Sequence, residues 1–84
     1  MDKITLEIIT PEGAIFNGEV TSVTLPGAKD VFTVLIKHAP IISTLTKGKI
    51  IYNIDDKIFS IESNGGVVEV KNNVVTVCLE TIIK

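Results

Sequence analysis

The stretch VVEVKNNVVTVCLE, residues 67–80, indicates the fold class more clearly than any other part of this chain of 84 residues. Its apolar residues recur at every second position, as in Val75, Val77 and Leu79. A period of two places alternate side chains on opposite faces of a β-strand. Between the two apolar halves lies Lys71–Asn73, whose asparagines tolerate the left-handed backbone that a tight turn requires. The stretch therefore predicts two strands separated by a short turn.

The same pattern extends over the rest of the chain. Alternating segments rich in Ile, Val and Thr are interrupted by turn residues at Pro11–Gly13, Asn17–Gly18, Pro26–Gly27, Lys47–Gly48, Asp55–Asp56 and Asn64–Gly66. Asn17–Gly18 has the composition of a tight hairpin turn, and Glu19–Leu25 is expected to be one segment that ends at Pro26. The helix-like stretch His38–Leu45 contains Pro40 and several β-branched residues, which disfavour a helix.

These signals predict an all-β fold, a small β-sandwich of about eight to ten short strands in two sheets. We expect β-structure alone over Lys3–Ile82, with no helix longer than about two turns. Residues 1–84 are long enough for a single domain. Hydrophobic residues make up 45% of the chain and charged residues 21%, a balance that disfavours disorder.

Composition also narrows the possible partners. The net charge is −2 and the chain contains no arginine, which argues against a nucleic-acid partner. Cys78 is the single cysteine, so an intramolecular disulfide is excluded. No apolar run approaches the roughly 20 residues that span a bilayer, so we expect no direct insertion into a membrane.

Few residues are of the kinds that catalyse reactions or bind metals. The chain has no phosphate-binding glycine loop, and one His with one Cys cannot form a closed metal site. A Cys78–His38 nucleophilic pair is formally possible, but Cys78 lies in a strand pattern where cysteine acts as a small buried hydrophobe. The adjacent carboxylates Asp55 and Asp56 suit a solvated turn better than an acid–base pair. The sequence therefore predicts a protein that is not an enzyme and needs no cofactor.

Seven short motifs, in order along the chain, carry a resemblance to a known family. They are Thr10–Gly13 (TPEG), Phe16–Val20 (FNGEV), Pro26–Gly27 (PG), His38–Pro40 (HAP), Lys47–Gly48 (KG), Ser63–Val70 (SNGGVVEV) and Asn73–Val77 (NVVTV). Their order and spacing resemble the epsilon subunit of the bacterial F-type ATP synthase, which corresponds to the delta subunit of the mitochondrial enzyme. The match runs from about Leu6 to Glu80, nearly the whole chain.

The chain departs from this family in three places. Members have Pro-Gly before the His-Ala-Pro motif, where this chain has Ile36 and Lys37. The preceding loop is glycine-rich in the family and reads DVFT here, at Asp30–Thr33. Most members also carry a C-terminal helical hairpin that inhibits ATP hydrolysis. We expect residues 1–84 to be the β-sandwich domain alone, a short form without the helical domain.

The resemblance implies a non-catalytic subunit of the central stalk, the rotor of a proton-translocating ATP synthase. Such a subunit links gamma to the ring of c subunits and helps to couple rotation to ATP synthesis. It would lie, as a peripheral subunit, at the cytoplasmic face of the bacterial inner membrane. The implied partners are gamma and the c-ring, and no homo-oligomer is required.

Matching positions assigns residues to each partner. The family's loops at the end of the sandwich facing the c-ring correspond to Ala28, Lys29, Asp30, Val31 and His38. An ordinary solvated turn is the alternative interpretation of this loop. The expected gamma contacts are Pro40, Ile41, Ile42 and Thr44. The alternative for the isoleucines is that they are plain core residues, since only a contiguous exposed apolar patch would indicate an interface.

A different class of function stays open beside this one. The alternative is a free-standing β-sandwich that acts as a binding or adhesion module. Such modules carry their binding residues on long loops, whereas every loop expected here is short. A small enzyme is a weaker alternative, because no nucleophile–base set is evident.

Overall fold

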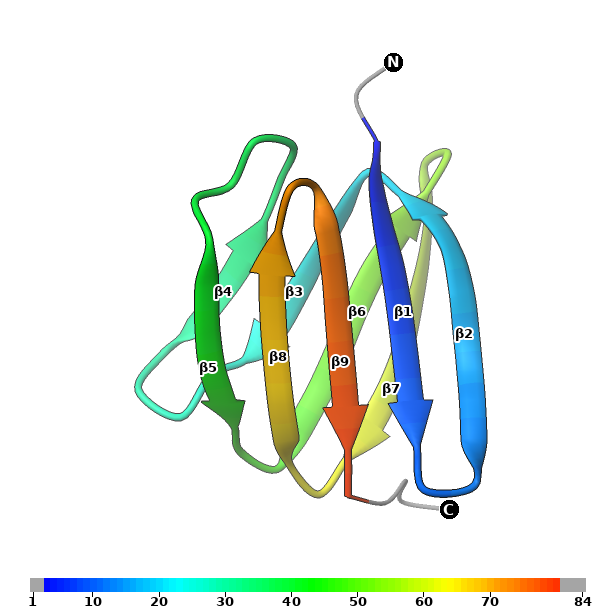
Figure 1. Cartoon of the computed structure of the whole chain (residues 1–84). Helices are drawn as coiled ribbons and strands as arrows, with labels where there is room; N and C mark the ends of the chain where they lie inside the picture. The colour runs from blue at the N-terminus through cyan, green and yellow to red at the C-terminus, as the bar shows by residue number, and fades with distance from the viewer. Residues whose placement is uncertain (1–2, 81–84) are drawn as a thin grey trace.

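The computed structural model describes residues 3–80 as nine β-strands in two sheets that pack face to face (Figure 1). The strands are β1 (Ile4–Thr10), β2 (Gly13–Val20), β3 (Ser22–Pro26), β4 (Val31–Val34), β5 (Ile41–Leu45), β6 (Gly48–Ile54), β7 (Lys57–Ser63), β8 (Gly66–Lys71) and β9 (Val74–Leu79). The prediction of an all-β sandwich is confirmed. Residues 81 and 82 of the range predicted to be β-structure lie outside the described residues.

The two sheets differ in size. The first has five strands in the order β2-β1-β9-β8-β5, and the second has four in the order β4-β3-β6-β7. All pairs are antiparallel except β1 with β9, which run parallel through Thr5–Ile9 and Val74–Cys78. The outermost strands of each sheet pair on one side only. These edge strands are β2 and β5 in the larger sheet and β4 and β7 in the smaller one.

The core lies between the sheets and follows the alternation in the sequence. Ile4, Leu6 and Ile8 are at most 1% exposed, while the residues between them face outward and are half-buried. The other buried apolar side chains are Val20, Val23, Leu25, Val34, Leu45, Ile50, Tyr52, Val68, Val70, Val75, Val77 and Leu79. Burying one such side chain fully contributes about 1.5–3 kcal/mol, so this layer is the main source of the fold's stability.

Two of the predicted turns are two-residue hairpins with left-handed backbone. The φ angles are 48° at Asp55 and 71° at Asp56, and 52° at Asn72 and 62° at Asn73. Positive φ at both central residues matches the twist of the flanking strands, and Asn and Asp adopt it at low cost. Both turn predictions are confirmed.

The predicted hairpin turn at Asn17–Gly18 is wrong. Both residues lie inside β2, where Asn17 pairs with Glu7 and Gly18 with Leu6. The chain turns earlier, before Gly13, whose φ of 127° suits only glycine. Gly18 serves packing instead, because a Cβ there would lie 3.2 Å from the ring of Phe16.

The segment Glu19–Leu25 was expected to be one unit, and the structure divides it between the two sheets. β2 ends at Val20 in the larger sheet, and β3 begins at Ser22 in the smaller one. At the crossing point the backbone N–H and the side-chain hydroxyl of Thr21 both donate to the carbonyl of Asn53, at 2.9 and 3.2 Å. A pattern of alternating residues cannot reveal such a change of sheet, since the period of two continues through it.

The stretch His38–Leu45 forms no helix, as expected, and its second part is strand β5. None of residues 3–80 belongs to a helix that could cross a membrane.

A candidate interaction groove between two edge strands

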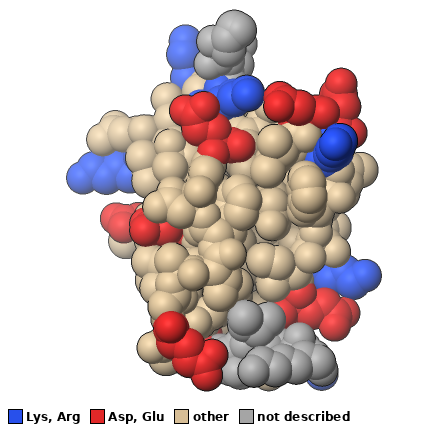
Figure 2. Space-filling view, turned by 90° about the vertical axis from the view of Figure 1, so that its right-hand side faces the viewer, with Lys and Arg blue, Asp and Glu red and all other residues tan. Residues whose placement is uncertain are grey.

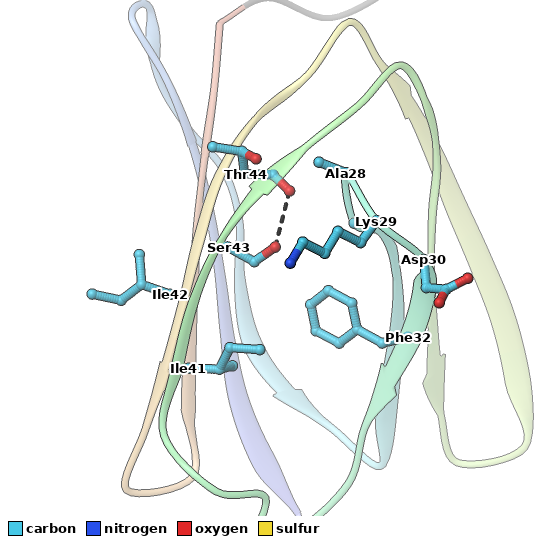
Figure 3. Close-up of a pocket in the computed structure, with 9 residues that line it drawn as sticks. Ala28, Lys29, Asp30, Phe32, Ile41, Ile42, Ser43 and Thr44 are labelled. Atoms are coloured by element: carbon cyan, nitrogen blue, oxygen red, sulfur yellow. Dashed lines mark hydrogen bonds between the residues drawn. The ribbon is translucent and has the colours of Figure 1, made fainter.

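The edge strands β4 and β5 face each other at the left of Figure 1, and an open groove of about 600 Å³ lies between them. We call it the β4–β5 groove (Figure 3). It is lined by Gly27, Ala28, Lys29, Asp30, Phe32, Ile41, Ile42, Ser43 and Thr44. The groove therefore brings together the loop before β4 and the strand β5, which the sequence analysis assigned to two different partners.

Backbone contacts between the two sheets fix one end of the groove. The N–H of Ala28 donates to the carbonyl of Thr44 at 3.0 Å, and the N–H of Thr46 donates to the carbonyl of Pro26 at 2.9 Å. Gly27 allows the tight turn of the loop itself, because a Cβ there would lie 2.5 Å from the carbonyl oxygen of Asp30. The loop is thus fastened to β5 by backbone hydrogen bonds, unlike an ordinary solvated turn.

Apolar and charged side chains take different positions around the groove. Phe32 and Ile41 are half-buried, pack against the core and form an apolar floor. Figure 3 shows the side chain of Lys29 reaching across the groove toward Ser43, while Asp30 points away from it. Among residues 3–80 the single ion pair joins Lys3 and Asp55, so Lys29 has no acidic partner there.

The residues assigned to the c-ring lie at both ends of β4. Ala28, Lys29 and Asp30 line the groove, and Val31 is 68% exposed at the start of β4. His38 follows the other end of β4, in the loop to β5 (Figure 1). The four residues of β4 separate the loop from the His38 corner, but the ring of His38 lies 6.5 Å from the ring of Phe32, so the His38 side chain stays close to the groove.

The residues assigned to gamma occupy both faces of β5 and the loop before it. Ile42 is 73% exposed and points away from the core, and Thr44 lies on the same face. Ile41 points into the groove, and Pro40 is exposed. Ile42 is therefore not a core residue, whereas Ile41 is part of the packing between the sheets.

Lys37 orients the corner before His38. Its φ is 64°, the left-handed region in which a residue with a Cβ is strained. Its N–H donates to the Oδ1 of Asn73 at 2.7 Å, which ties the corner to the β8–β9 turn. The positive φ gives a physical reason for the glycine that the resembling family has at this position.

We expect the Lys37→Gly variant to be more stable than the original chain by about 0.5 kcal/mol, or a few degrees in Tm. Glycine removes the strain and keeps the N–H that Asn73 accepts. The matched variant Asn73→Gly should lower Tm, because it removes the Oδ1 that accepts from this N–H while tolerating the positive φ at residue 73. Thermal melts of both variants test this, and a lower Tm for Lys37→Gly would show that Lys37 is not strained.

Cys78 is exposed on the outer face of the larger sheet, so the interpretation of Cys78 as a buried hydrophobe is wrong. It pairs with Val67 and Ile9 across the sheet, where the alternation turns it outward. Within residues 3–80, no three His, Cys, Asp or Glu side chains gather closely enough to hold a metal ion.

A second surface was missed by the sequence analysis. At the edge strands β2 and β7, Tyr52 packs between Phe16 and Phe59, with ring centroids 4.7 and 5.6 Å apart. Ile15, at the bulge before Phe16, and Ile58 are also exposed, 39% and 73% respectively, and Ile58 lies on the opposite face of β7 from Phe59. Figure 2 shows this side of the molecule, with charged groups mostly around its margin. Burial raises the pKa of Tyr52, which keeps its hydroxyl neutral.

We call this second surface the β2–β7 face. Its signal in the sequence was the adjacent pair Ile58 and Phe59, which places apolar side chains on both faces of one strand. An open groove and an apolar face, on a small rigid sandwich, are features of a protein that binds other proteins.

Comparison with known proteins identifies the family. The chain belongs to the family described as ATP synthase, Delta/Epsilon chain, beta-sandwich domain, which residues 3–84 match. It is 47% identical over 81 residues to the ATP synthase epsilon chain of Sulfurimonas denitrificans, covering 95% of this chain and 62% of that one. It is 48% identical to the epsilon chain of Nitratiruptor sp., covering 95% of this chain and 63% of that one. The chain thus spans under two thirds of the length of these relatives.

Solved structures agree with the fold. A chain in the mitochondrial ATP synthase of Euglena gracilis, in an assembly described as OSCP/F1/c-ring, superposes with a TM-score of 0.90 at 19% identity, covering 96% of this chain and 52% of that one. A chain in the central stalk and c-ring of the Tetrahymena thermophila enzyme gives 0.79 at 12% identity, covering 95% and 65%. At such identities the likeness extends to the fold alone.

Proposed function

We propose that this chain is a non-catalytic rotor subunit of a proton-translocating F-type ATP synthase, which links gamma to the c-ring. Membership of the delta/epsilon β-sandwich family supports the proposal. The observation that carries it is the β4–β5 groove, where residues matched to both partners line one concave surface. In this role the chain is a single domain, peripheral to the membrane at its cytoplasmic face.

The mechanism we propose is mechanical coupling. Two sheets joined by ladder hydrogen bonds and a close-packed core resist deformation, so torque applied to one surface reaches the other with little loss. No group on the chain needs to react, and no cofactor takes part. The subunit helps to couple rotation to ATP synthesis by keeping gamma and the c-ring in fixed register.

The geometry suggests how the partners divide the surface. Asp30, Val31 and His38 lie along the edge that β4 forms, so a c-ring that contacts all three lies beside this edge. Ala28 and Lys29 form the adjoining wall of the groove. Pro40, Ile42 and Thr44 are exposed on and before β5, where gamma docks beside the c-ring, and Ile41 lies in the groove between the two.

Copurification tests the proposal against its main alternative. The chain, expressed with its cognate gamma subunit, should be recovered as a stoichiometric complex that then binds the c-ring. A free-standing binding or adhesion module would remain separate from gamma. Loss of ATP-driven proton pumping in membranes depleted of this chain, with recovery on its return, would support the coupling role. Unchanged pumping would contradict it.

Charge at the β4 edge offers a second test. Asp30 is exposed and has no ion pair among residues 3–80. An exposed charge of this kind contributes under about 1 kcal/mol to the free energy of unfolding, so Asp30→Lys should leave Tm of the isolated domain nearly unchanged. If Asp30 contacts the c-ring, the variant should weaken the coupling of proton flow to ATP synthesis, and more so at low salt. Glu12→Lys, at the exposed β1–β2 turn, is the control. If both variants couple proton flow to ATP synthesis equally well, Asp30 is not part of the interface with the c-ring.

A further inference from the structure

The backbone of β5 carries hydrogen-bonding groups that no other described strand uses. β5 is the outermost strand of its sheet, and β8 is the one strand paired along it; on its other side a single bridge joins Leu45 to Gly27. The carbonyl of Thr44 accepts from Ala28 on the side away from β8. The N–H and C=O of one strand residue point to the same side, and successive residues alternate. The N–H of Thr44 and both backbone groups of Ile42 therefore face away from β8, along the β4–β5 groove.

Unpaired backbone groups at a sheet edge are a template for another strand. The segment 26–28 occupies only the C-terminal end of this edge, through the bonds to Thr44 and Thr46. Three backbone groups, spread over Ile42 to Thr44, remain available. They match an extended segment of about three or four residues, since a strand rises about 3.3 Å per residue.

The groove also limits the chemistry of that segment. Side chains of an added strand would alternate between the outer face and the apolar floor of Phe32 and Ile41. Lys29 reaches into the groove and has no acidic partner among residues 3–80, so it favours a carboxylate on the incoming segment. Asp30 points away and does not oppose that carboxylate.

We propose that gamma binds this chain by adding a short extended segment, apolar and with one carboxylate, to the free edge of β5. The inference rests on the proposed function, because it takes gamma as the partner. It adds a mode of binding: main-chain hydrogen bonds to Ile42 and Thr44, and an ion pair with Lys29. The larger sheet then continues from this chain into gamma, which would make the joint resistant to shear.

Amide hydrogen exchange, followed residue by residue by NMR, tests this in the unaltered chain. In the isolated domain we expect the amides of Ile41 and Ser43 to be protected by their bonds to β8 and those of Ile42 and Thr44 to exchange fast. Adding the gamma subunit should slow exchange at Ile42 and Thr44 by about tenfold or more and leave Ile41 and Ser43 little changed. Protection of these two amides shows that gamma covers the free edge of β5, and the substitutions below show whether it does so through main-chain hydrogen bonds.

Substitution gives a second, independent test. Ile42→Pro removes the free N–H and keeps every bond to β8, since edge strands tolerate proline where the N–H faces outward. Ile42→Thr keeps the N–H and the branched shape. We expect Ile42→Pro to bind gamma at least about tenfold more weakly than Ile42→Thr, with Tm of both variants checked first. Lys29→Gln should reduce the salt dependence of binding, and Lys47→Gln, also exposed, should not.

The outcomes separate the inference from the proposed function. If gamma binds but exchange at Ile42 and Thr44 stays fast, strand addition is wrong and the proposed function stands. If gamma does not bind at all, both are wrong. If the same amides become protected as the chain alone is concentrated, the edge pairs with a second copy, which also overturns the inference.

Discussion

The Gly66→Ala variant is expected to lose about 3 kcal/mol or more of its free energy of unfolding, because an added Cβ makes a closer contact here than at any other glycine of the chain. A Cβ on Gly66 would lie 2.1 Å from the carbonyl oxygen of Cys78 and 3.0 Å from the Cα of Leu79. These are backbone atoms of β9, which cannot move aside as a side chain can. The added methyl therefore forces β8 and β9 apart in the middle of the larger sheet.

Thermal and urea denaturation measure this effect. A domain of this size has a total stability of about 4–12 kcal/mol, so the variant should melt at least about 12 °C lower or fail to fold at 25 °C. Gly18→Ala is the matched control. Its Cβ would meet only the ring of Phe16, at 3.2 Å, and a side chain can yield, so we expect a change under about 1 kcal/mol. Equal Tm values for the two variants would show that β9 accommodates the methyl.

The second large effect concerns binding to gamma, and two isoleucines make a matched pair. Ile42 and Ile58 are both 73% exposed, on opposite sides of the sandwich. Ile42→Asp should reduce affinity for gamma by at least about tenfold, because the carboxylate would be buried without a partner at the interface. Ile58→Asp should leave the affinity unchanged, and neither variant should unfold the domain, because neither side chain lies in the core.

A pull-down and a titration of gamma, together with thermal melts, decide between the two surfaces. If only Ile58→Asp loses binding, gamma binds at the β2–β7 face and not at β5. If neither variant loses affinity for gamma, neither isoleucine lies in the interface with gamma. Because both side chains start at the same exposure, a difference between the variants reports the position of the interface rather than a general effect of charge.

The fold was predictable from local patterns because each pattern acts within a few residues. The period of two set which side chains face the core, so Val75, Val77 and Leu79 could be placed on one face before any contact was known. Asp55–Asp56 and Asn72–Asn73 were recognisable as turns, because their side chains tolerate positive φ. Family membership followed from seven such motifs in order, and the comparison confirmed it.

The errors arose where a local signal has more than one physical use. Asn17–Gly18 reads as a turn, yet the missing Cβ of Gly18 makes room for the ring of Phe16 within β2. Cys78 reads as a core residue by composition, but it alternates with the buried Val77 and Leu79 and therefore faces outward. The sequence also could not show that the chain changes sheet at Thr21, because strand alternation is the same on both sides.

The sequence by itself determined the all-β class, most of the core and the family, since these depend on patterns repeated along the chain. Only the tertiary structure decided the candidate site. The β4–β5 groove exists because two edge strands from different sheets face each other, and the free edge of β5 exists because β8 pairs with only one of its sides. Both follow from strand order. Strand order is set by packing among all nine described strands at once, so no single stretch of sequence specifies it.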